Sequence, residues 1–352
     1  MRTSFELVIG DRVVGPNCPP YVIAELSGNH NGDIDRAFQI MAAAKQAGVD
    51  AVKLQTYTAD TLTIDCDRSD FQIAGGPWNG FRLYELYREA STPWEWHEAL
   101  FAKGAELGIT VFSSPFDDAA VNFLEELGCP AYKIASFEAV DIPLIRKAAG
   151  TGKPLIISTG MVDQEEIEEA VCAAKEAGAS SVSLLHCVSA YPAKPAESNL
   201  RSIPELGARF GTVAGLSDHT LGTSVSVAAV ALGASIIEKH VTLKRADGGP
   251  DAGFSLEPDE LSRLVSECRT AWEALGNVRI GRQAAAKNSM VFRRSLYVVE
   301  DIAEGEAFTM QNVRSIRPGH GLPPKCLADV IGGKATKDIA RGTPLDWSLV
   351  GK

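Results

Sequence analysis

A repeating alternation of short apolar runs and helix-forming stretches is the feature that most constrains this chain of 352 residues. From Tyr21 onward, each apolar run ends in small or polar residues and is followed by a stretch rich in Ala, Glu and Lys. The eight runs are YVIAEL (21–26), AVKLQTY (51–57), TVFSSPF (110–116), AYKIAS (131–136), LIISTG (155–160), SVSLLHC (181–187), TVAGLSD (212–218) and SIIEKHV (235–241). Near-continuous apolar strands that alternate with helices indicate a parallel sheet covered on both faces.

Eight such units predict a closed (β/α)8 TIM barrel. The alternative is an open, doubly wound sheet, which usually has a Gly-rich phosphate turn after its first strand. Here the first run is followed by SGNHNG (27–32) and not by G-x-G-x-x-G, so the barrel is favoured. Glycines that end the helical stretches, as in AKQAGVD and AELGIT, support the division into units.

The residue pattern changes outside the repeating region, which predicts further structural units. We expect an N-terminal hairpin over residues 1–20, the barrel over 21–275, a linker over 276–290 and a small, mainly β domain over 291–352. A long insertion over residues 58–92 follows the second strand and carries several aromatic residues. Long loops on the side of a barrel where active sites form are often functional.

The composition excludes some classes of partner. A net charge of −11 without a basic stripe argues against binding to nucleic acid or to an anionic membrane. No run approaches the ~18 apolar residues that a membrane helix needs, and the first 20 residues hold no signal-peptide stretch. Seven scattered cysteines without a Cys-x-x-Cys pair are typical of reduced thiols, so we expect a cytoplasmic protein.

Catalytic groups of a (β/α)8 barrel come from the carboxyl ends of its strands. The polar residues that we place at those ends are Glu25, Lys53, Gln55, Thr110, Lys133, Ser136, Ser158, Tyr191, His219 and His240. Lys and Glu are rarely buried in an apolar strand unless they are paired or used in function. We therefore expect Lys53 and Lys133 to serve the site, whereas Lys239 points to the opposite side of its strand from His240 and is expected to be structural.

His219 and His240 end consecutive strands, and their imidazoles could converge on one divalent metal ion. Asp218 and Glu238 are then expected to orient the rings. Two hydrogen-bonding core histidines would show the same spacing, so the residues alone leave both interpretations open.

A series of motifs extends through most of the chain in one order. They are AEL-x-x-NHNG, VKLQTY, FSSPFD, YKIAS-x-E, STGM, LLHC-x-x-x-YP, GLSDHT, ALGA-x-x-IEKH and GGPD followed by SLEP. Over residues 21–258 the chain resembles the sialic acid synthase family, and RRSLYV … IRPGHG … GTPL resembles its antifreeze-like (SAF) domain. Within the family, GPWNG-x-x-LYELYREASTPWEWH is more similar to the pseudaminic acid synthase branch than to the N-acetylneuraminate branch.

The resemblance implies a C–C bond-forming transferase that condenses phosphoenolpyruvate with an open-chain acetamido sugar and releases phosphate. The branch implies 2,4-diacetamido-2,4,6-trideoxy-L-altrose as the sugar and pseudaminic acid as the product. The alternative acceptors are N-acetylmannosamine or a related sugar, as in N-acetylneuraminate and legionaminic acid synthases. The resemblance further implies a homodimer with an exchanged C-terminal domain.

The family's roles are carried onto this chain residue by residue. His219 and His240 resemble the protein ligands of a Mn2+ or Mg2+ ion, and Glu25 resembles an acid/base near the water that adds to the substrate. The residues that resemble the phosphoenolpyruvate cradle are Lys53, Thr110, Lys133, Ser136, Ser158, Ser189 and Ser217. Those that resemble the sugar-binding set are Gln55, Glu138, Tyr191, Asp251 and, from the tail of a neighbouring subunit, Arg317.

Three other functions remain compatible with the fold. A Schiff-base aldolase would use Lys133 or Lys53 and need no metal. A catalytically inactive barrel could serve as a sugar-binding module, although such a module has no need of a metal pair. A condensation onto a phosphorylated sugar would need more cations near the barrel mouth than the motifs offer.

Overall fold

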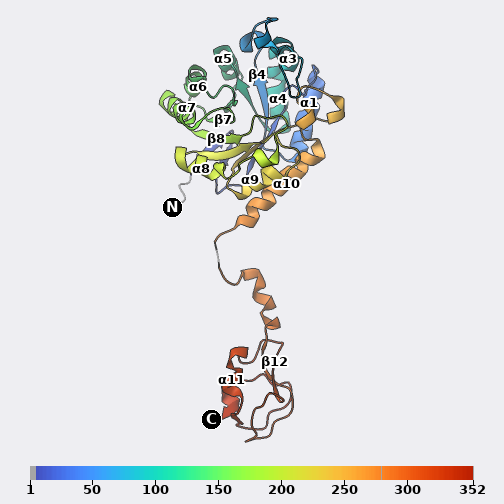
Figure 1. Cartoon of the computed structure of the whole chain (residues 1–352), viewed down its shortest axis with the longest axis vertical. Helices are drawn as coiled ribbons and strands as arrows, with labels where there is room; N and C mark the ends of the chain where they lie inside the picture. The colour runs from blue at the N-terminus through green and yellow to red at the C-terminus, as the bar shows by residue number, and fades with distance from the viewer. Residues whose placement is uncertain (1–4, 279, 352) are drawn as a thin grey trace. The chain divides into compact units, whose positions relative to one another are not determined.

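The computed structural model describes residues 5–278 and 280–351. It divides into two compact units, with the division after Gly276 (Figure 1). Each unit has its own core of buried hydrophobic residues.

The first unit is a closed barrel of eight parallel strands, as the repeating pattern predicts. The strands are β3 (Tyr21–Glu25), β4 (Ala51–Thr56), β5 (Thr110–Pro115), β6 (Tyr132–Ile134), β7 (Leu155–Ser158), β8 (Val182–Cys187), β9 (Val213–Ser217) and β10 (Ile236–His240). They pair in chain order, and β10 closes the barrel by pairing with both β9 and β3. The (β/α)8 fold is therefore confirmed.

Eight helices, one after each strand, surround the barrel (Figure 1). They are α1 (Ile34–Ala47), α4 (His97–Leu107), α5 (Asp118–Glu126), α6 (Ile142–Ala149), α7 (Gln164–Ala177), α8 (Ser202–Phe210), α9 (Ser224–Ala231) and α10 (Pro258–Leu275). The predicted glycine stops are confirmed, since α1, α4 and α7 end at Gly48, Gly108 and Gly178 in the left-handed conformation. These stops turn the chain back into the next strand.

A short hairpin precedes the barrel. Strands β1 (Leu7–Ile9) and β2 (Arg12–Val14) pair antiparallel, and Gly10 takes a positive φ of 59° in the turn. A Cβ at Gly10 would lie 3.1 Å from the hydroxyl of Thr110, the first residue of β5. The hairpin thus packs at the amino ends of the strands and leaves the carboxyl ends to the strand-to-helix loops.

The insertion between β4 and α4 contains two helices, α2 (Ala59–Leu62) and α3 (Leu83–Ala90). Between them, Ile73 and Phe81 bring a glycine-rich turn together through a backbone hydrogen bond of 2.9 Å. This long loop lies on the carboxyl side of β4 and so belongs to the mouth of the barrel.

The second unit is small and built mainly from β structure. Strands β11 (Ser295–Val298) and β12 (Val313–Ile316) pair antiparallel, as do β13 (Lys334–Ala335) and β14 (Val350–Gly351), and α11 covers Leu327–Val330. Leu296, Val298, Phe308 and Leu345 are fully buried in its core.

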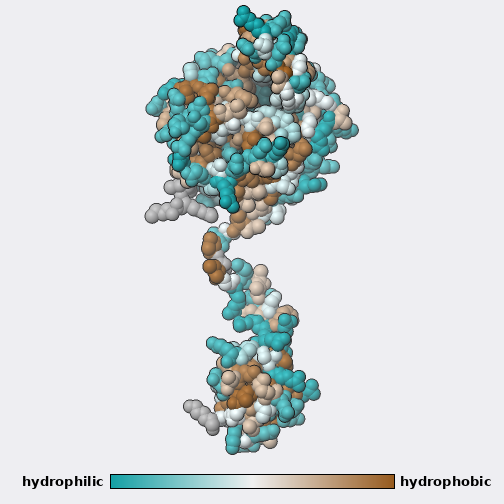
Figure 2. Space-filling model, viewed as in Figure 1, coloured by the Kyte–Doolittle hydropathy of each residue, from teal (hydrophilic) through white to brown (hydrophobic). Residues whose placement is uncertain are grey.

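The segment that we predicted to be a linker is partly ordered. A 3-10 helix spans Ala284–Phe292. Such a helix rises only ~2.0 Å per residue, so the segment reaches less far than an extended chain. Val278 and Ile280 are 98% and 101% exposed, and Figure 2 shows the hydrophobic surface that this segment presents.

Candidate active site

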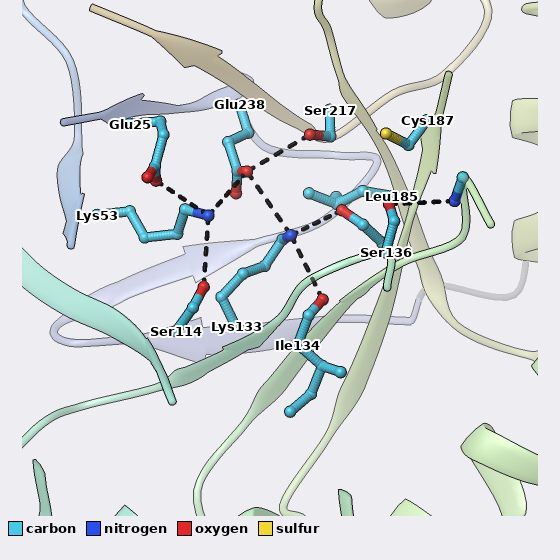
Figure 3. A network of polar contacts seen from close by, with 12 residues as sticks. Glu25, Lys53, Ser114, Lys133, Ile134, Ser136, Leu185, Cys187, Ser217 and Glu238 are labelled. Carbon is cyan, nitrogen blue, oxygen red and sulfur yellow. Dashed lines mark hydrogen bonds and ion pairs between the residues drawn. The ribbon is translucent and has the colours of Figure 1, made fainter. Parts of the chain in front are cut away.

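Four charged side chains lie buried together inside the barrel at the carboxyl side of its strands. Glu25, Lys53, Lys133 and Glu238 are each at most 4% exposed. Lys53 Nζ lies 2.9 Å from Glu25 Oε2 and 3.1 Å from Glu238 Oε1, and Lys133 Nζ lies 3.6 Å from the same Glu238 oxygen. Figure 3 shows both ammonium groups pointing at this one carboxylate. Burial of unpaired charges would be costly, and the two-against-two balance removes most of that cost.

The parallel register explains how strands remote in sequence build this cluster. Glu25 lies beside His240 on one side and beside Lys53 on the other. The three residues are register partners on neighbouring strands, so their side chains enter the barrel at a similar depth.

Hydroxyl groups surround the two ammonium groups. Lys133 Nζ donates to Ser158 Oγ at 2.7 Å, and Lys53 Nζ donates to Ser114 Oγ at 3.4 Å. Ser217 Oγ donates to Glu238 Oε1 at 3.4 Å. Two cations with several hydroxyl donors form a cradle suited to a small anion with many oxygens.

Ser136 and Ser189 join this cradle around Gly160. A Cβ at Gly160 would lie 2.4 Å from Ser189 Oγ and 3.0 Å from both Ser136 Oγ and Cys187 Sγ. The backbone N–H of Gly160 donates to Ser136 Oγ. Only glycine fits here, because any side chain would displace the hydroxyls.

Thr110 does not belong to the cradle, and its prediction as a strand-end residue was wrong. It is the first residue of β5 and contacts the N-terminal hairpin. Ser114 lies four residues further on, which is ~13 Å along a strand, and it contacts Lys53 instead. The motif FSSPFD could have indicated Ser114, because its polar residues mark where the apolar strand ends.

The protonation of the cluster follows from burial and from the pairing. Burial raises the pKa of Glu25, although Lys53 works against this. Burial would also raise the pKa of Glu238, but Lys133 and Lys53 outweigh it and lower the pKa to about 2. Burial lowers the pKa of Lys133 despite its contact with Glu238. The cluster thus holds one firmly ionised carboxylate, Glu238, and one carboxyl group able to exchange a proton, Glu25.

His219 and His240 meet at the mouth, with ring centroids 5.4 Å apart. His219 Nδ1 lies 3.0 Å from the carbonyl oxygen of Val188, and His240 Nδ1 lies 3.4 Å from Asp251 Oδ2. With each Nδ1 facing an oxygen, each Nε2 is left as the lone-pair donor, which is the usual arrangement around a metal-binding histidine. This donor set fits a divalent ion that keeps open positions for water and substrate. Among the described residues, no group of three or more His, Cys, Asp or Glu side chains could hold a metal.

The residues that orient the histidines differ from those predicted. Asp218 accepts hydrogen bonds from Lys239 Nζ at 2.8 Å and from Ser226, away from the rings. Glu238 forms ion pairs with Lys53 and Lys133. Asp251 takes the predicted role at His240. Lys239 is fully buried against Asp218, which agrees with its predicted structural role.

The predicted sugar-binding residues of the barrel gather around the same place. Gln55 Nε2 donates to Glu25 Oε1 at 2.9 Å, and the ring of Tyr191 lies 4.5 Å from that of His219. Burial raises the pKa of Glu138 to about 7, although Lys133 works against it. Arg317 belongs to the second unit, where its side chain is exposed.

Besides Ser114, two contributors escaped the sequence prediction. Glu238 was assigned to the histidines, because no local pattern shows that two lysines from other strands point at it. Cys187 lies 3.8 Å from His219 Nδ1, and only its place at the end of a strand, in LLHC, could have indicated it.

A closed parallel barrel with ionisable groups clustered at the carboxyl ends of its strands defines a TIM-barrel enzyme. Residues 40–279 match the model of the NeuB family, and residues 293–351 match that of the SAF domain. The chain therefore belongs to the NeuB family. No helix in residues 5–278 and 280–351 is both long and apolar enough to cross a membrane.

Similar proteins include several synthases. The pseudaminic acid synthase of Helicobacter pylori is 44% identical over 329 residues, which cover 93% of this chain and 96% of that protein. The N,N'-diacetyllegionaminic acid synthase of Legionella pneumophila is 35% identical over 345 residues, covering 96% of each chain. The crystal structure of the N-acetylneuraminic acid synthetase of Leptospira borgpetersenii in complex with citrate is 32% identical, with a TM-score of 0.74, and the match covers 82% of this chain and 97% of that one. The predicted family and its SAF tail are thus confirmed.

Proposed function

We propose that this chain condenses phosphoenolpyruvate with 2,4-diacetamido-2,4,6-trideoxy-L-altrose and water, giving pseudaminic acid and phosphate. The buried pair Lys53 and Lys133, held by one oxygen of Glu238, carries the proposal. Two preplaced ammonium groups with serine hydroxyls suit an anion that has both a carboxylate and a phosphate. The pseudaminic acid synthases among its relatives support the choice of acceptor.

The residues of the cradle bind and orient phosphoenolpyruvate. Lys53 and Lys133 contact its anionic groups, and Ser114, Ser136, Ser158, Ser189 and Ser217 donate hydrogen bonds. Gln55, Glu138, Tyr191 and Asp251 hold the open-chain sugar with its aldehyde carbon facing C3 of phosphoenolpyruvate. Orientation of two reactants in this way supplies a large share of the rate.

The new C–C bond forms between C3 of phosphoenolpyruvate and the aldehyde carbon, whose oxygen takes up a proton and becomes a hydroxyl. Water then adds to C2, and Glu25 accepts its proton, which the raised pKa of this carboxyl group makes favourable. The bond between C2 and the bridging oxygen breaks, phosphate leaves with that oxygen and takes up the proton of the new C2 hydroxyl, and C2 becomes a ketone. Phosphoenolpyruvate with 18O in the bridging position should therefore give labelled phosphate, and label retained in the sugar acid would mean a different mechanism.

His219 and His240 are the residues that would hold a divalent ion, Mn2+ or Mg2+. When bound there, the ion supplies a Lewis acid for the aldehyde oxygen. We expect EDTA to abolish turnover, Mn2+ or Mg2+ to restore it, and His219→Ala to match the stripped enzyme. Full activity in metal-free buffer would favour the Schiff-base alternative, which borohydride trapping on Lys133 or Lys53 would then identify.

Phosphate release across a panel of acetamido sugars tests the reaction and the acceptor together. We expect 2,4-diacetamido-2,4,6-trideoxy-L-altrose to have a far higher kcat/KM than N-acetylmannosamine or the legionaminic acid precursor. A preference for N-acetylmannosamine would overturn the acceptor while the phosphoenolpyruvate chemistry remained.

A homodimer in which the tail of one copy completes the site of the other is part of this proposal. Phe137, Val140, Met161 and Leu221 lie in loops at the barrel mouth and are 52–60% exposed. Such an apolar rim supports a covering surface from a partner.

None of the seven cysteines, all within the described part of the chain, forms a disulfide, which supports a reducing, cytoplasmic setting.

A further inference from the structure

The insertion between β4 and α4 contains a tight turn that presents Trp78. Gly80 N–H donates to the carbonyl oxygen of Ile73 at 2.9 Å, and Gly75 N–H donates to Asn79 Oδ1 at 2.6 Å. Gly75 and Gly80 take φ values of 84° and 91°. Other residues rarely adopt this conformation, so the glycines allow the turn that places Trp78 at its tip.

Trp78 reaches two other loops of the barrel mouth. Its indole N–H donates to the carbonyl oxygen of Pro250 at 2.8 Å, which belongs to the loop after β10. Its ring centroid lies 5.2 Å from that of Tyr191, in the loop after β8. One side chain thus joins three segments that are far apart in the sequence.

Both contacts lead directly to the histidine pair. Asp251 follows Pro250, accepts from Ser27 Oγ and lies 3.4 Å from His240 Nδ1. On the other side, the ring of Tyr191 packs 4.5 Å from His219 and 5.2 Å from Phe254. Trp78 is therefore the outer member of a cluster of tilted aromatic rings whose inner members are the histidines.

We propose that Trp78 is a positioning residue for the acceptor sugar. It holds Tyr191 and Asp251 at the spacing that the sugar requires, and its ring with Tyr191 forms an apolar wall for a methyl substituent. The inference rests on the proposed function and adds to it the residue through which the insertion acts. Among the described residues, neither Lys53 nor Lys133 forms a hydrogen bond or ion pair with Trp78, so we expect the contacts of the two lysines with phosphoenolpyruvate not to depend on it.

The test compares Trp78→Phe and Trp78→Ala with Trp94→Phe as a matched control. Trp94 stacks on Phe123 at 4.8 Å, and its indole nitrogen has no hydrogen-bond partner among the described residues. Trp78→Phe keeps a ring but loses one hydrogen bond, so we expect the acceptor KM to rise about 3- to 10-fold. Trp78→Ala should raise it further and reduce the preference for the 6-deoxy sugar over N-acetylmannosamine about tenfold.

The KM for phosphoenolpyruvate should stay unchanged in Trp78→Phe, and the lost hydrogen bond should lower its Tm by only about 2 °C. Trp94→Phe should behave as wild type. A merely structural role would instead raise both KM values together, and that result in Trp78→Phe overturns the inference. Unchanged acceptor kinetics in both Trp78 variants also overturns it. Wild-type enzyme that releases no phosphate with any acceptor overturns the proposed function itself.

Discussion

Glu238 shows how one residue can set the charge of a whole site. One of its oxygens lies 3.1 Å from Lys53 Nζ and 3.6 Å from Lys133 Nζ. Without it, two ammonium groups would repel each other in a buried space, and one would lose its proton. Glu238 therefore raises the pKa of both lysines, against the lowering effect of burial, before an anion arrives.

Loss of one of these lysines should weaken the binding of phosphoenolpyruvate and leave the binding of the sugar unchanged. Lys133→Ala removes a charge-assisted contact, so we expect the KM for phosphoenolpyruvate to rise about 10- to 100-fold. The acceptor KM should change little in the same steady-state assay. Lys153→Ala is a suitable control, because Lys153 pairs with Glu125 at the surface, outside the site. Unchanged kcat and KM in Lys133→Ala would remove Lys133 from the cradle.

Ser114 and Thr110 offer a matched comparison within one strand. Ser114→Ala removes the hydroxyl next to Lys53, and we expect the KM for phosphoenolpyruvate to rise about 3- to 10-fold, as one hydrogen bond is lost. Thr110→Val, at the other end of β5, should leave both KM values at the wild-type level. The opposite pattern in the same kinetic assay would restore Thr110 to the site.

His30 should make the barrel sensitive to acid. Its side chain is fully buried, and burial lowers its pKa from 6.5 to about 4. Between these two values the unfolded chain binds a proton that the folded chain does not. Above pH 6.5 this group does not reduce the free energy of unfolding. As the pH drops from 6.5 toward 4, the free energy of unfolding falls by roughly 3 kcal/mol because of His30.

The comparison variant is His30→Asn, which keeps an acceptor for the N–H of Gly32. We expect its free energy of unfolding, measured with urea from pH 7 to 4.5, to fall less steeply than that of the wild type. Parallel slopes for the two proteins would show that His30 does not cause the acid sensitivity.

At the scale of elements, a buried ion pair between Lys239 and Asp218 stabilises the packing of β10 against its neighbours on the outer side of the barrel. Lys239 and Asp218 are at most 1% exposed at their side chains, and Ser226 of α9 donates to the same carboxylate at 2.6 Å. The pair joins β10 to the loop after β9 and to α9. It also keeps the two histidine-bearing strand ends together.

Breaking this pair on one side should be costly. Lys239→Met leaves the charge of Asp218 buried, and we expect the free energy of unfolding to fall by about 3–5 kcal/mol. The double variant Lys239→Met/Asp218→Asn removes both charges and should recover much of the loss. Urea unfolding of the two variants beside the wild type measures this, and a single variant within about 1 kcal/mol of wild type would contradict it.

At the scale of the whole molecule, two units with separate cores share one chain. Arg317 belongs to the second unit, whereas the cradle and the histidines belong to the first. An exchanged tail would let one copy supply Arg317 to its partner, so subunits with different defects should complement each other.

The experiment mixes Arg317→Ala with His219→Ala subunits, each inactive alone, and allows exchange. Half of the dimers are then mixed and each holds one intact site, so we expect about a quarter of the wild-type activity. The measurement is phosphate release from purified mixtures, with unmixed variants as controls. No rescue in verified mixed dimers would show that the tail acts within its own chain or not at all.

The pattern of the sequence alone determined the barrel, the hairpin before it and the tail, because strand and helix periods are local properties of the chain. It also indicated Glu25, Lys53, Lys133 and both histidines, since charged or metal-binding side chains at the ends of apolar strands are unusual. Thr110 shows the limit of that reasoning. Until the bounds of a strand are known, the sequence does not tell whether a polar residue lies at its amino end or at its carboxyl end.

Only the tertiary structure decided which groups meet. Glu238 is shared by lysines from β4 and β6, and Asp251 returns from a loop to face His240. Trp78 joins two loops that follow it by more than a hundred residues in the sequence. Barrel closure and strand register set these meetings, and both arise from the packing of all eight strands at once, so no segment encodes them by itself.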